Sequence, residues 1–545
     1  MSVTGLRKLN AVPIVVGVFS SGDAPALTDA ALSERFGEIV DRFAKAYTST
    51  PIVVLSSLAT RPDFVAAEEA MRRGISVVAC LKKPAEEHER DFSSMALEQL
   101  RSILDRCSGT IVVENVGSFI AYYSALLVTF GPGARGSPDA ATVPVFEIDR
   151  LSVREFYPER LGVLNIGKKK KKRAASAQPG RDEFESALRN LDRFNCDIAR
   201  ESIPEAEDAL DAFRLRADSA SNRLQKWTLH SLRGLYVVAA IAGATQLVVQ
   251  PPATDVLGGA LNTAGTAVRI GVLAIAFLWF KFAKHKDYEN RYQDYRAIAE
   301  ALRVQHAWCS AGLRSCLVEN SYLQMQQSEL RWIRLALKTI YLVSDARSPQ
   351  SGDSPDCSEC SGWIDGQLKF YEGAAVAQAR KQQHIVLSGG VLGAIGGAIG
   401  GLAVVLLLAN NGVPLGGHLA FLGIHAQHWS LASQWPQLQN AKKSIADWAT
   451  YLTTVPPTLA GMFALLLGFY AQQRGFTENS RRYQRVFTVF EAAQRKLLEH
   501  SGKPEDVLGD LGHEALTEHA DWLILHRERP LRVITAPISM QGVQQ

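Results

Sequence analysis

The stretch IVLSGGVLGAIGGAIGGLAVVLLLA, residues 385–409, has the clearest membrane-span pattern in the chain. It contains no Asp, Glu, Lys or Arg, and a helix needs about 20 mostly apolar residues to cross a bilayer. Because lipid offers no hydrogen bonds to the backbone, such a run predicts a helix. Three weaker apolar runs lie at Leu235–Val249, Ile270–Phe282 and Val455–Tyr470. The sequence therefore predicts four membrane-spanning helices.

The second and fourth apolar runs are followed by similar charged and aromatic segments. Arg291-Tyr292-Gln293 corresponds to Arg482-Tyr483-Gln484, a shift of 191 positions, and the same shift maps Glu300 onto Glu491. Self-similarity at a fixed spacing indicates a repeated structural unit. The sequence therefore predicts that a module of two spans and a trailing helix occurs twice.

Both trailing segments carry an apolar seam spaced by three and four residues, which favours helix pairing. The first seam includes Tyr288, Tyr292, Tyr295, Ala299 and Leu302, and the second includes Tyr483, Val486, Phe490, Ala493 and Leu497. One interpretation is a cytosolic stalk in which the two copies pack together or pack across an oligomer. The alternative is that each is an amphipathic helix lying on its own domain.

Glycines recur along the run at residues 385–409. They are Gly389, Gly390, Gly393, Gly396, Gly397, Gly400 and Gly401. Glycines four residues apart form a flat helix face on which another backbone approaches closely. The partner of this face is either another helix of the same chain or a second subunit around a pore, and the sequence leaves both open.

The charge pattern predicts the orientation of the spans. The chain has 545 residues and a formal net charge of +4, with basic clusters before the first and third runs and after the second and fourth, including Lys168–Lys172 and Arg380-Lys381. By the positive-inside rule both termini of this multi-pass protein are expected in the cytosol. The scattered cysteines indicate a reducing compartment. Cys357 and Cys360 are spaced as half a zinc site, but no second pair follows, so no metal or other cofactor is expected.

The N-terminal part alternates short apolar runs with amphipathic segments. Strands are predicted at 13–19, 51–55, 75–81, 110–113, 126–130 and 143–148, and helices at 26–46, 63–73 and 87–106. Continuously apolar strands separated by helices indicate an α/β domain with a parallel sheet covered on both faces. In such folds ligands lie outside the carboxyl ends of the strands.

Small polar residues follow the predicted strands at that edge. Ser20, Ser21 and Gly22 follow the first strand, Ser56 and Ser57 end the second, and Gly131 follows the fifth. Hydroxyls and free backbone N–H groups beside a helix N-terminus can bind phosphate. These positions are the predicted ligand-binding residues.

Two segments of the sequence resemble known families. PIVVLSSLATRPDFVAAEEAMRRGISVVACL followed by EEHERDF is similar to the SLOG family, a Rossmann-like group related to the DprA and LOG proteins. NRYQDYRAIAEALRVQHAW and EALTEHADWLILHRERP resemble SLATT, the SMODS- and SLOG-associating two-transmembrane effector. The first resemblance implies that Asp63 and Glu68 belong to the ligand site. The alternative is that Asp63 is a helix cap and Glu68 a surface residue.

The sequence also departs from the SLOG pattern. Arg61-Pro62 stand where a glycine usually precedes the acidic residue, and Asp23-Ala24 replace a histidine-arginine pair. The motif of the phosphoribohydrolase members is missing, which argues against hydrolysis without excluding an enzyme.

The resemblances imply a multi-pass effector of the bacterial inner (cytoplasmic) membrane that senses a nucleotide-type ligand and forms or gates a pore in antiphage conflict. Expected partners are a nucleotide-type small molecule, the lipid bilayer and further copies of the chain, but no nucleic-acid polymer. The alternatives are a membrane-tethered nucleotide- or NAD-processing hydrolase and a passive membrane scaffold. The expected domains are a SLOG-like domain (1–160), a basic linker (161–181), a first two-span module (182–345), a connector (346–381), a second two-span module (382–530) and a tail (531–545).

Overall fold

The computed structural model divides the chain into two compact units. Unit 1 comprises Met1–Arg223, Arg291–Ile364 and Ala492–Arg527, and unit 2 comprises Leu224–Asn290, Asp365–Glu491 and Glu528–Gln545. The residues that the structure describes are 9–20, 27–89, 94–130, 143–149, 152–158, 179–203, 206, 208–248, 259–313, 315–317, 322–323, 327–344, 357–410, 436–499 and 503–528.

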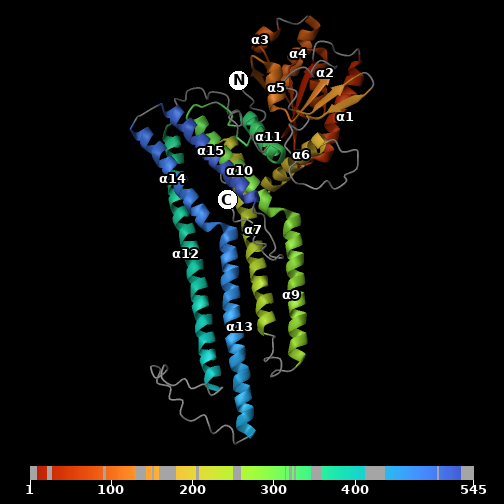
Figure 1. Ribbon diagram of the computed structural model, residues 1–545. Coiled ribbons are helices and arrows are strands. Elements are labelled where there is room, and N and C mark those ends of the chain that lie inside the picture. The colour runs from red at the N-terminus through yellow and green to blue at the C-terminus, as the bar shows by residue number, and fades with distance from the viewer. Residues whose placement is uncertain are drawn as a thin grey trace. The chain divides into compact units, whose positions relative to one another are not determined.

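A seven-stranded sheet forms the N-terminal domain of unit 1 (Figure 1). Its strands, in spatial order, are β4 (Gly109–Val112), β3 (Ser76–Leu81), β2 (Ile52–Ser56), β1 (Ile14–Ser20), β5 (Leu126–Phe130), β6 (Val145–Ile148) and β7 (Val153–Phe156). The first six are parallel, which confirms the predicted sheet. The last strand, β7, runs antiparallel to β6 at the edge and was not predicted.

Helices cover both faces of this sheet. They are α1 (Asp29–Ala46), α2 (Arg61–Arg72), α3 (Ala85–His88), α4 (Ser94–Arg106) and α5 (Val116–Tyr123). The last of these was not predicted, and it lies close against the central strand, because a Cβ on Gly17 would overlap Ser124 and Ile120. Glycine at position 17 therefore allows α5 to pack tightly on β1.

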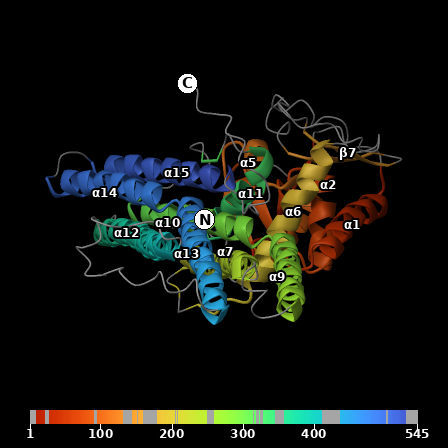
Figure 2. The ribbon, with the colours of Figure 1, turned by 60° about the horizontal axis from the view of Figure 1, so that its bottom comes forward.

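The remainder of unit 1 is a helical bundle beside the sheet. It contains α6 (Pro179–Ile198), the first part of α7 (Ala209–Val248), α10 (Tyr288–Ser310), α11 (Gln327–Val343) and α15 (Pro504–Glu528). The helices α6 and α11 pack on each other next to the sheet (Figure 2). The α10 seam residue Tyr295 packs its ring on Phe194 of α6 and Trp332 of α11. Trp308 of α10 donates a 3.0 Å hydrogen bond to the carbonyl of Leu508 in α15. From Tyr292 onward, the seam of α10 is therefore buried within unit 1.

Unit 2 consists of long helices that, apart from α14, run along a common direction (Figure 1). They are the second part of α7, α9 (Gly259–Lys286), α12 (Cys357–Asn410), α13 (Pro436–Arg474) and the first part of α14 (Phe476–Leu498). Tyr236 of α7 packs on Tyr470 of α13 with 5.5 Å between ring centroids. Large apolar side chains on α9 and α12 are exposed, including Ile275, Leu278 and Leu387. Such surface is suited to contact with lipid rather than water.

Three described helical segments contain a stretch long and apolar enough to cross a membrane. They are Thr263–Ser310, Ser361–Val405 and Thr450–Leu498, and the stretch in the first corresponds to α9. They match three of the four predicted spans. The remaining run, Leu235–Val249, is helical through Val248, where the described part of α7 ends.

The two trailing helices begin in the same way. A single residue with positive φ separates each from its apolar helix, Asp287 (φ 52°) before α10 and Gly475 (φ 59°) before α14. Each trailing helix then packs on the first helix of its own hairpin, since Ser221 of α7 donates to the carbonyl of Tyr292 and Ser480 of α14 to that of Ala375 in α12. The repeat therefore extends from the sequence to the helix packing.

The glycines of α12 fall on two faces. A Cβ on Gly396 would lie 2.5 Å from the Cβ of Ala460, and one on Gly400 would lie 2.8 Å from Pro457 Cγ, so this face packs on α13. No atom lies within 4 Å of a Cβ built on Gly393 or Gly397. The predicted close packing therefore occurs within the chain at one face, while the other face is open.

Candidate functional site

The carboxyl edge of the parallel sheet contains the predicted ligand residues that the structure describes. The strand order reverses between β1 and β5, which is where ligands bind in open α/β sheets. The register pairs Val18 with Ser56 and Ser20 with Phe130. Strand β1 therefore continues two residues past the position paired with Ser56. Ser20 lies at the carboxyl edge of the sheet, beside the point where the strand order reverses.

Ser57 and Asp63 organise the turn between β2 and α2. The Ser57 hydroxyl donates to Asp63 Oδ2 at 2.7 Å, and the same oxygen accepts from the backbone N–H of Ala59 at 3.2 Å and of Thr60 at 3.1 Å. Ser56 Oγ accepts from the N–H of Leu58 at 3.3 Å. Leu58 is buried with φ at 45°, a conformation that this network holds. Asp63 is therefore the third residue of the helix and caps its own first turn.

Asp63 is fully buried, and this changes its acidity. Burial raises the pKa of its carboxyl from the ordinary 3.8 to about 6, although the hydrogen bonds from Ser57, Ala59 and Thr60 act in the opposite direction. Desolvation disfavours the charged form, and hydrogen bonds to a carboxylate favour it. The capping role that the sequence left open is thus realised, with Asp63 oriented inward beneath the turn.

The other predicted residues have different positions. Ser20 is buried at the end of β1, and its hydroxyl has no hydrogen-bond partner among the described residues. Glu68 lies more than one helical turn beyond Asp63 and accepts a 3.2 Å hydrogen bond from Gln99 Nε2 of α4. Ser21, Gly22 and Gly131 lie outside the described residues. The structure therefore brings Ser56, Ser57 and Asp63 together beside the strand that ends at Ser20.

The first turns of two helices meet at the same edge. Thr28 caps α1 by accepting from the N–H of Ala31 at 3.4 Å. Arg61, the first residue of α2, pairs with Asp29, the first residue of α1, at 2.6 Å. Both side chains are largely exposed. Arg61, which stands where the SLOG pattern has a glycine, therefore brings a guanidinium to the rim of the crevice.

Sequence reasoning missed several residues at this edge. Lys82 and Lys83 follow β3 and are exposed, and a ring nitrogen of His88 lies 3.4 Å from the carbonyl oxygen of Leu58. On β6, Glu147 is buried and pairs in register with Thr129 of β5. The sequence did contain signals for these residues: Lys82 and Lys83 directly follow one apolar strand, and Glu147 lies inside another.

A second set of contacts joins the sheet to the helical bundle through α6. The side chain of Asn195 accepts from the N–H of Val12 at 2.8 Å and donates to its carbonyl at 2.9 Å. Asp192 Oδ1 accepts from the N–H of Ser49 and the hydroxyl of Thr50, both at 2.8 Å. These contacts hold α6 against the ends of the sheet opposite the candidate ligand edge.

The other partner of α6 is α10. Asp197 Oδ2 accepts a 2.6 Å hydrogen bond from the Tyr295 hydroxyl and an ion-paired hydrogen bond from the Arg291 guanidinium. Burial, and then the nearby Asp197 carboxylate, raise the pKa of Tyr295 well above its usual value, so its hydroxyl remains a donor. Arg291 begins the part of α10 that belongs to unit 1. Two residues apart on α6, Asn195 and Asp197 therefore contact the sheet and the trailing helix respectively.

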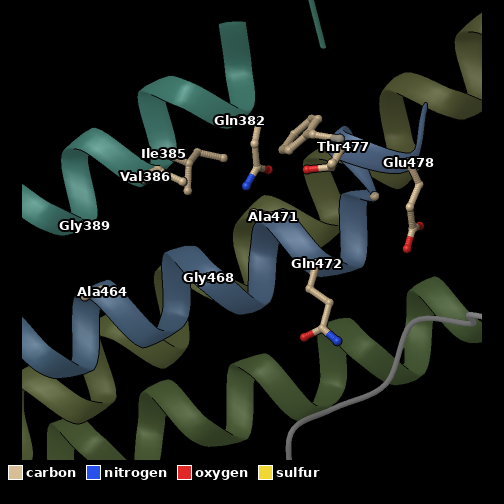
Figure 3. A pocket seen from close by; sticks show the side chains of 12 residues that line it. Gln382, Ile385, Val386, Gly389, Ala464, Gly468, Ala471, Gln472, Thr477 and Glu478 are labelled. Atoms are coloured by element: carbon tan, nitrogen blue, oxygen red, sulfur yellow. The ribbon is translucent and has the colours of Figure 1, made fainter. Parts of the chain in front are cut away.

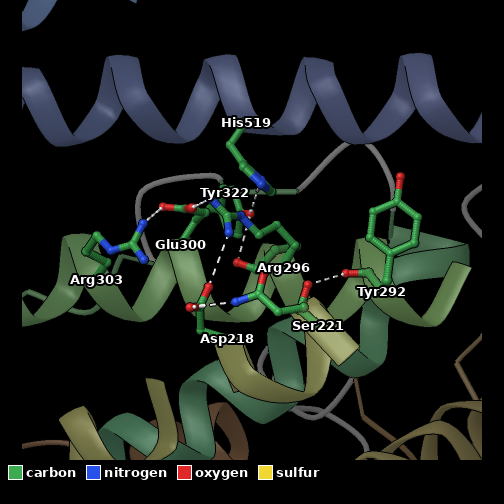
Figure 4. Close-up of polar contacts among 10 residues, drawn as sticks. Asp218, Ser221, Tyr292, Arg296, Glu300, Arg303, Tyr322 and His519 are labelled. Carbon is green, nitrogen blue, oxygen red and sulfur yellow. Dashed lines mark hydrogen bonds and ion pairs between the residues drawn. The ribbon is translucent and has the colours of Figure 1, made fainter. Parts of the chain in front are cut away.

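A further charged cluster lies on α10 (Figure 4). Glu300 pairs with Arg296 at 2.6 Å and with Arg303, and Arg296 also reaches Asp218 of α7 at 3.2 Å. Burial would raise the pKa of Glu300, but Arg296, Arg303 and His519 of α15 together lower it to about 2. This cluster ties three helices of unit 1 together.

The described part of the chain contains no group of three His, Cys, Asp or Glu side chains placed to hold a metal ion. No family model and no curated protein matches this chain. The class that the fold itself defines is a Rossmann-like parallel-sheet domain joined to long apolar helices.

Proposed function

We propose that this chain is a membrane effector in which the sheet domain binds a nucleotide-type ligand and the apolar helices form or gate a pore. The chain of contacts through α6 is the observation that carries this proposal. The resemblance to SLOG and SLATT proteins implies that such a pore acts in antiphage conflict in the bacterial cytoplasmic membrane. The basic residues that flank the apolar runs support termini in the cytosol.

The sheet edge offers chemistry suited to an anionic ligand with several polar groups. The Ser20 hydroxyl has no hydrogen-bond partner among the described residues. Lys82 and Lys83 bring positive charge to the same edge, where Arg61 is paired with Asp29. The strand order places the crevice at the end of β1. These features support phosphate recognition, while the self-capped turn at Asp63 supplies shape rather than direct contact.

The link through α6 supports transmission of binding to the membrane helices. Asn195 is bonded to Val12, two residues before β1, the strand that ends at Ser20. Asp197 is bonded to Arg291 and Tyr295 at the start of α10. Only Asp287 separates α10 from α9 along the chain. A ligand shifts the equilibrium between two states only when it binds them with different affinity. The proposal requires two such states, which differ in the position of β1 relative to α10.

The test is ligand-dependent ion flux through the full chain reconstituted in liposomes, with mono-, di- and cyclic nucleotides added on the side of the sheet domain. We expect one class of nucleotide to open the conductance, with no turnover of the nucleotide. Asp197→Asn should keep nucleotide binding but lose most of the ligand-dependent flux, because it removes the charge that holds Arg291. Asp182→Asn, an exposed aspartate of the same helix, is the matched control and should behave as wild type.

Three outcomes count against the proposal. Consumption of the nucleotide without flux would favour the membrane-tethered hydrolase. Flux that is equal with and without every nucleotide tested would remove the sensor role. Recovery of the chain in the soluble fraction would remove the membrane role altogether.

A further inference from the structure

A cavity of about 450 Å³ lies within unit 2, between α12 and α13 at the point where α14 begins (Figure 3). Its walls come from both helices of the second hairpin and from the first turn of α14. Gly475, whose positive φ marks the break between α13 and α14, is part of its wall. The cavity is separate from the sheet edge and from the charged cluster on α10.

The polarity of the cavity changes along its length. Val386 and Gly389 of α12 face Ala464 and Gly468 of α13 at one end, so that end is lined by apolar and small residues. Gln382, Gln472 and Thr477 line the other end, together with Glu478. Its occupant should therefore have an apolar part and a polar part.

The apolar end continues into surface that faces lipid in an inserted hairpin. Val386 is 60% exposed and the neighbouring Leu387 and Leu465 are each 65% exposed. The polar end lies beside positive charge, because Arg380 and Lys381 precede Gln382 and the Arg474 guanidinium lies 5.6 Å from the centre of the Phe476 ring. Glu478 is the acidic residue in the lining. Arg380, Lys381 and Arg474 outnumber it, so this end of the cavity has a net positive charge around it.

The size of the cavity favours a flexible chain over a helix from a second copy. The part of α12 that lines the cavity, Gln382–Gly389, is only about two helical turns long, which is short for a helix-to-helix contact. Its volume lies within the range of about 300–1,000 Å³ usual for small-molecule sites.

We propose that this cavity holds one acyl chain of an anionic phospholipid, with the headgroup phosphate beside Arg380, Lys381 and Arg474. The acyl chain contacts the apolar end, and the glutamine and threonine side chains contact the ester region. This inference rests on the proposed membrane insertion of α12 and α13, but not on nucleotide binding. It makes the second hairpin responsive to the composition of the leaflet.

The experiment uses the full chain in phosphatidylcholine nanodiscs that contain a photoactivatable phosphatidylglycerol with a diazirine midway along one acyl chain. Labelled peptides are mapped by mass spectrometry. We expect residues 382–389 and 464–475 to be labelled more strongly than the exposed apolar surface of α9. A phosphatidylcholine probe should label them less, and the triple variant Arg380→Gln/Lys381→Gln/Arg474→Gln should remove this preference, since each basic residue near the headgroups contributes about fivefold in affinity.

Two glycines of α13 provide a matched pair of variants. A Cβ on Gly468 or on Gly461 meets no atom within 4 Å, so the hairpin accommodates a side chain at either position. Only Gly468 lines the cavity. Gly468→Leu should therefore remove most of the labelling, and Gly461→Leu should leave it unchanged.

Each contrary result overturns the proposal in a distinct way. If the cavity residues are labelled no more than α9 and Gly468→Leu has no effect, the lipid there is ordinary annular lipid. If both probes label the cavity equally, the site does not select an anionic headgroup. Labelling of α9 without the cavity, together with cross-linking between copies through Val386→Cys, would assign the cavity to a second subunit. Absence of labelling on α9 would contradict the membrane insertion on which this inference rests. Nucleotide binding by the sheet domain is measured separately and would not be affected by that result.

Discussion

Asn195 pairs with Val12 as one strand pairs with another, because its side-chain amide accepts from the N–H and donates to the carbonyl of the same residue. Val12 lies two residues before the start of β1 and is fully buried. A side chain of α6 therefore completes the hydrogen bonding at the start of the central strand, 183 residues away along the chain. The same amide also donates to Thr50 Oγ1 at 3.1 Å, next to β2.

Replacing Asn195 should loosen the sheet at this point. Asn195→Leu keeps a similar volume but leaves the N–H and carbonyl of Val12 buried without partners, at a cost of about 2–4 kcal/mol. We expect hydrogen-exchange protection of the β1 amides to fall accordingly. Asn190→Leu, the same change at a half-buried position of α6, is the control and should have little effect. Unchanged protection in the Asn195 variant would show that α6 does not support the sheet.

The buried carboxyl of Asp63 should make the sheet domain less stable as the pH rises. Its pKa is about 6 in the folded chain and near 3.8 when exposed, so the folded state retains the proton to higher pH. This contribution is fully present below pH 3.8 and is lost as the pH rises through 6. The difference between the two pKa values corresponds to at most about 3 kcal/mol in the free energy of unfolding.

Urea unfolding of the sheet domain between pH 4 and 7 measures this dependence. The Asp63→Asn variant should lack it, because the amide does not titrate. Ser57→Ala should move the loss of stability to higher pH, since the hydroxyl of Ser57 favours the charged form. A wild-type profile parallel to that of Asp63→Asn would show that the carboxyl does not titrate in this range.

Much of the sheet was predictable because its strands are continuously apolar, a pattern that only a parallel sheet covered on both faces requires. The helix α5 was missed because its sequence, VGSFIAYY, is apolar on nearly every side and gives no helical period. The strand β7 was missed because it is short and half-buried at an edge. Neither feature has a strong local signal.

The candidate site was predictable only in part. The end of a strand is visible in the sequence, so Ser20 and Ser56 could be placed. The bond from Ser57 to Asp63 depends on Leu58 at positive φ, which a leucine rarely adopts and no local pattern indicates. The contacts of Asn195 and Asp197 join residues 183 and 94 positions apart, and only the fold brings these together.

Glu300 and Glu491, which the internal repeat relates, should differ sharply when mutated. Glu300 is mostly buried between Arg296 and Arg303, whereas Glu491 is exposed. Glu300→Gln leaves two arginines facing a neutral amide, which should cost about 3 kcal/mol or more. Glu491→Gln should change the stability by less than about 0.5 kcal/mol. Thermal unfolding of the two variants in the same detergent measures the contrast, and equal effects would show that the cluster in Figure 4 is not stabilising.

The pKa of Glu300 predicts how the stability contributed by the same cluster changes with pH. Because this pKa is lowered to about 2 from the usual 4.5, the cluster contributes stability above pH 4.5 and loses it as the pH falls through 2. Acid unfolding of wild type and Glu300→Gln should therefore converge below about pH 2. Curves that remain parallel down to that pH would contradict the assignment.

The two glycine faces of α12 should respond differently to a bulky side chain. In lipid, helices associate largely through close packing, so small residues matter at every contact. Gly396 faces Ala460 and Pro457 of α13, and Gly393 faces open space. Gly396→Leu should therefore separate the two helices of the hairpin, whereas Gly393→Leu should leave the hairpin intact and disrupt only contacts between copies.

A disulfide reports the hairpin independently of assembly. A Cβ on Gly389 would lie 4.0 Å from that of Ala464, within the range of about 3.5–4.5 Å that disulfides require. In a background without the native cysteines, Gly389→Cys/Ala464→Cys should oxidise readily, equally well with Gly393→Leu, and poorly with Gly396→Leu. The number of subunits, measured by light scattering in detergent, should fall with Gly393→Leu. If that number is unchanged while the disulfide still forms, the open glycine face is not the contact between copies, and assembly depends on other surfaces of the chain.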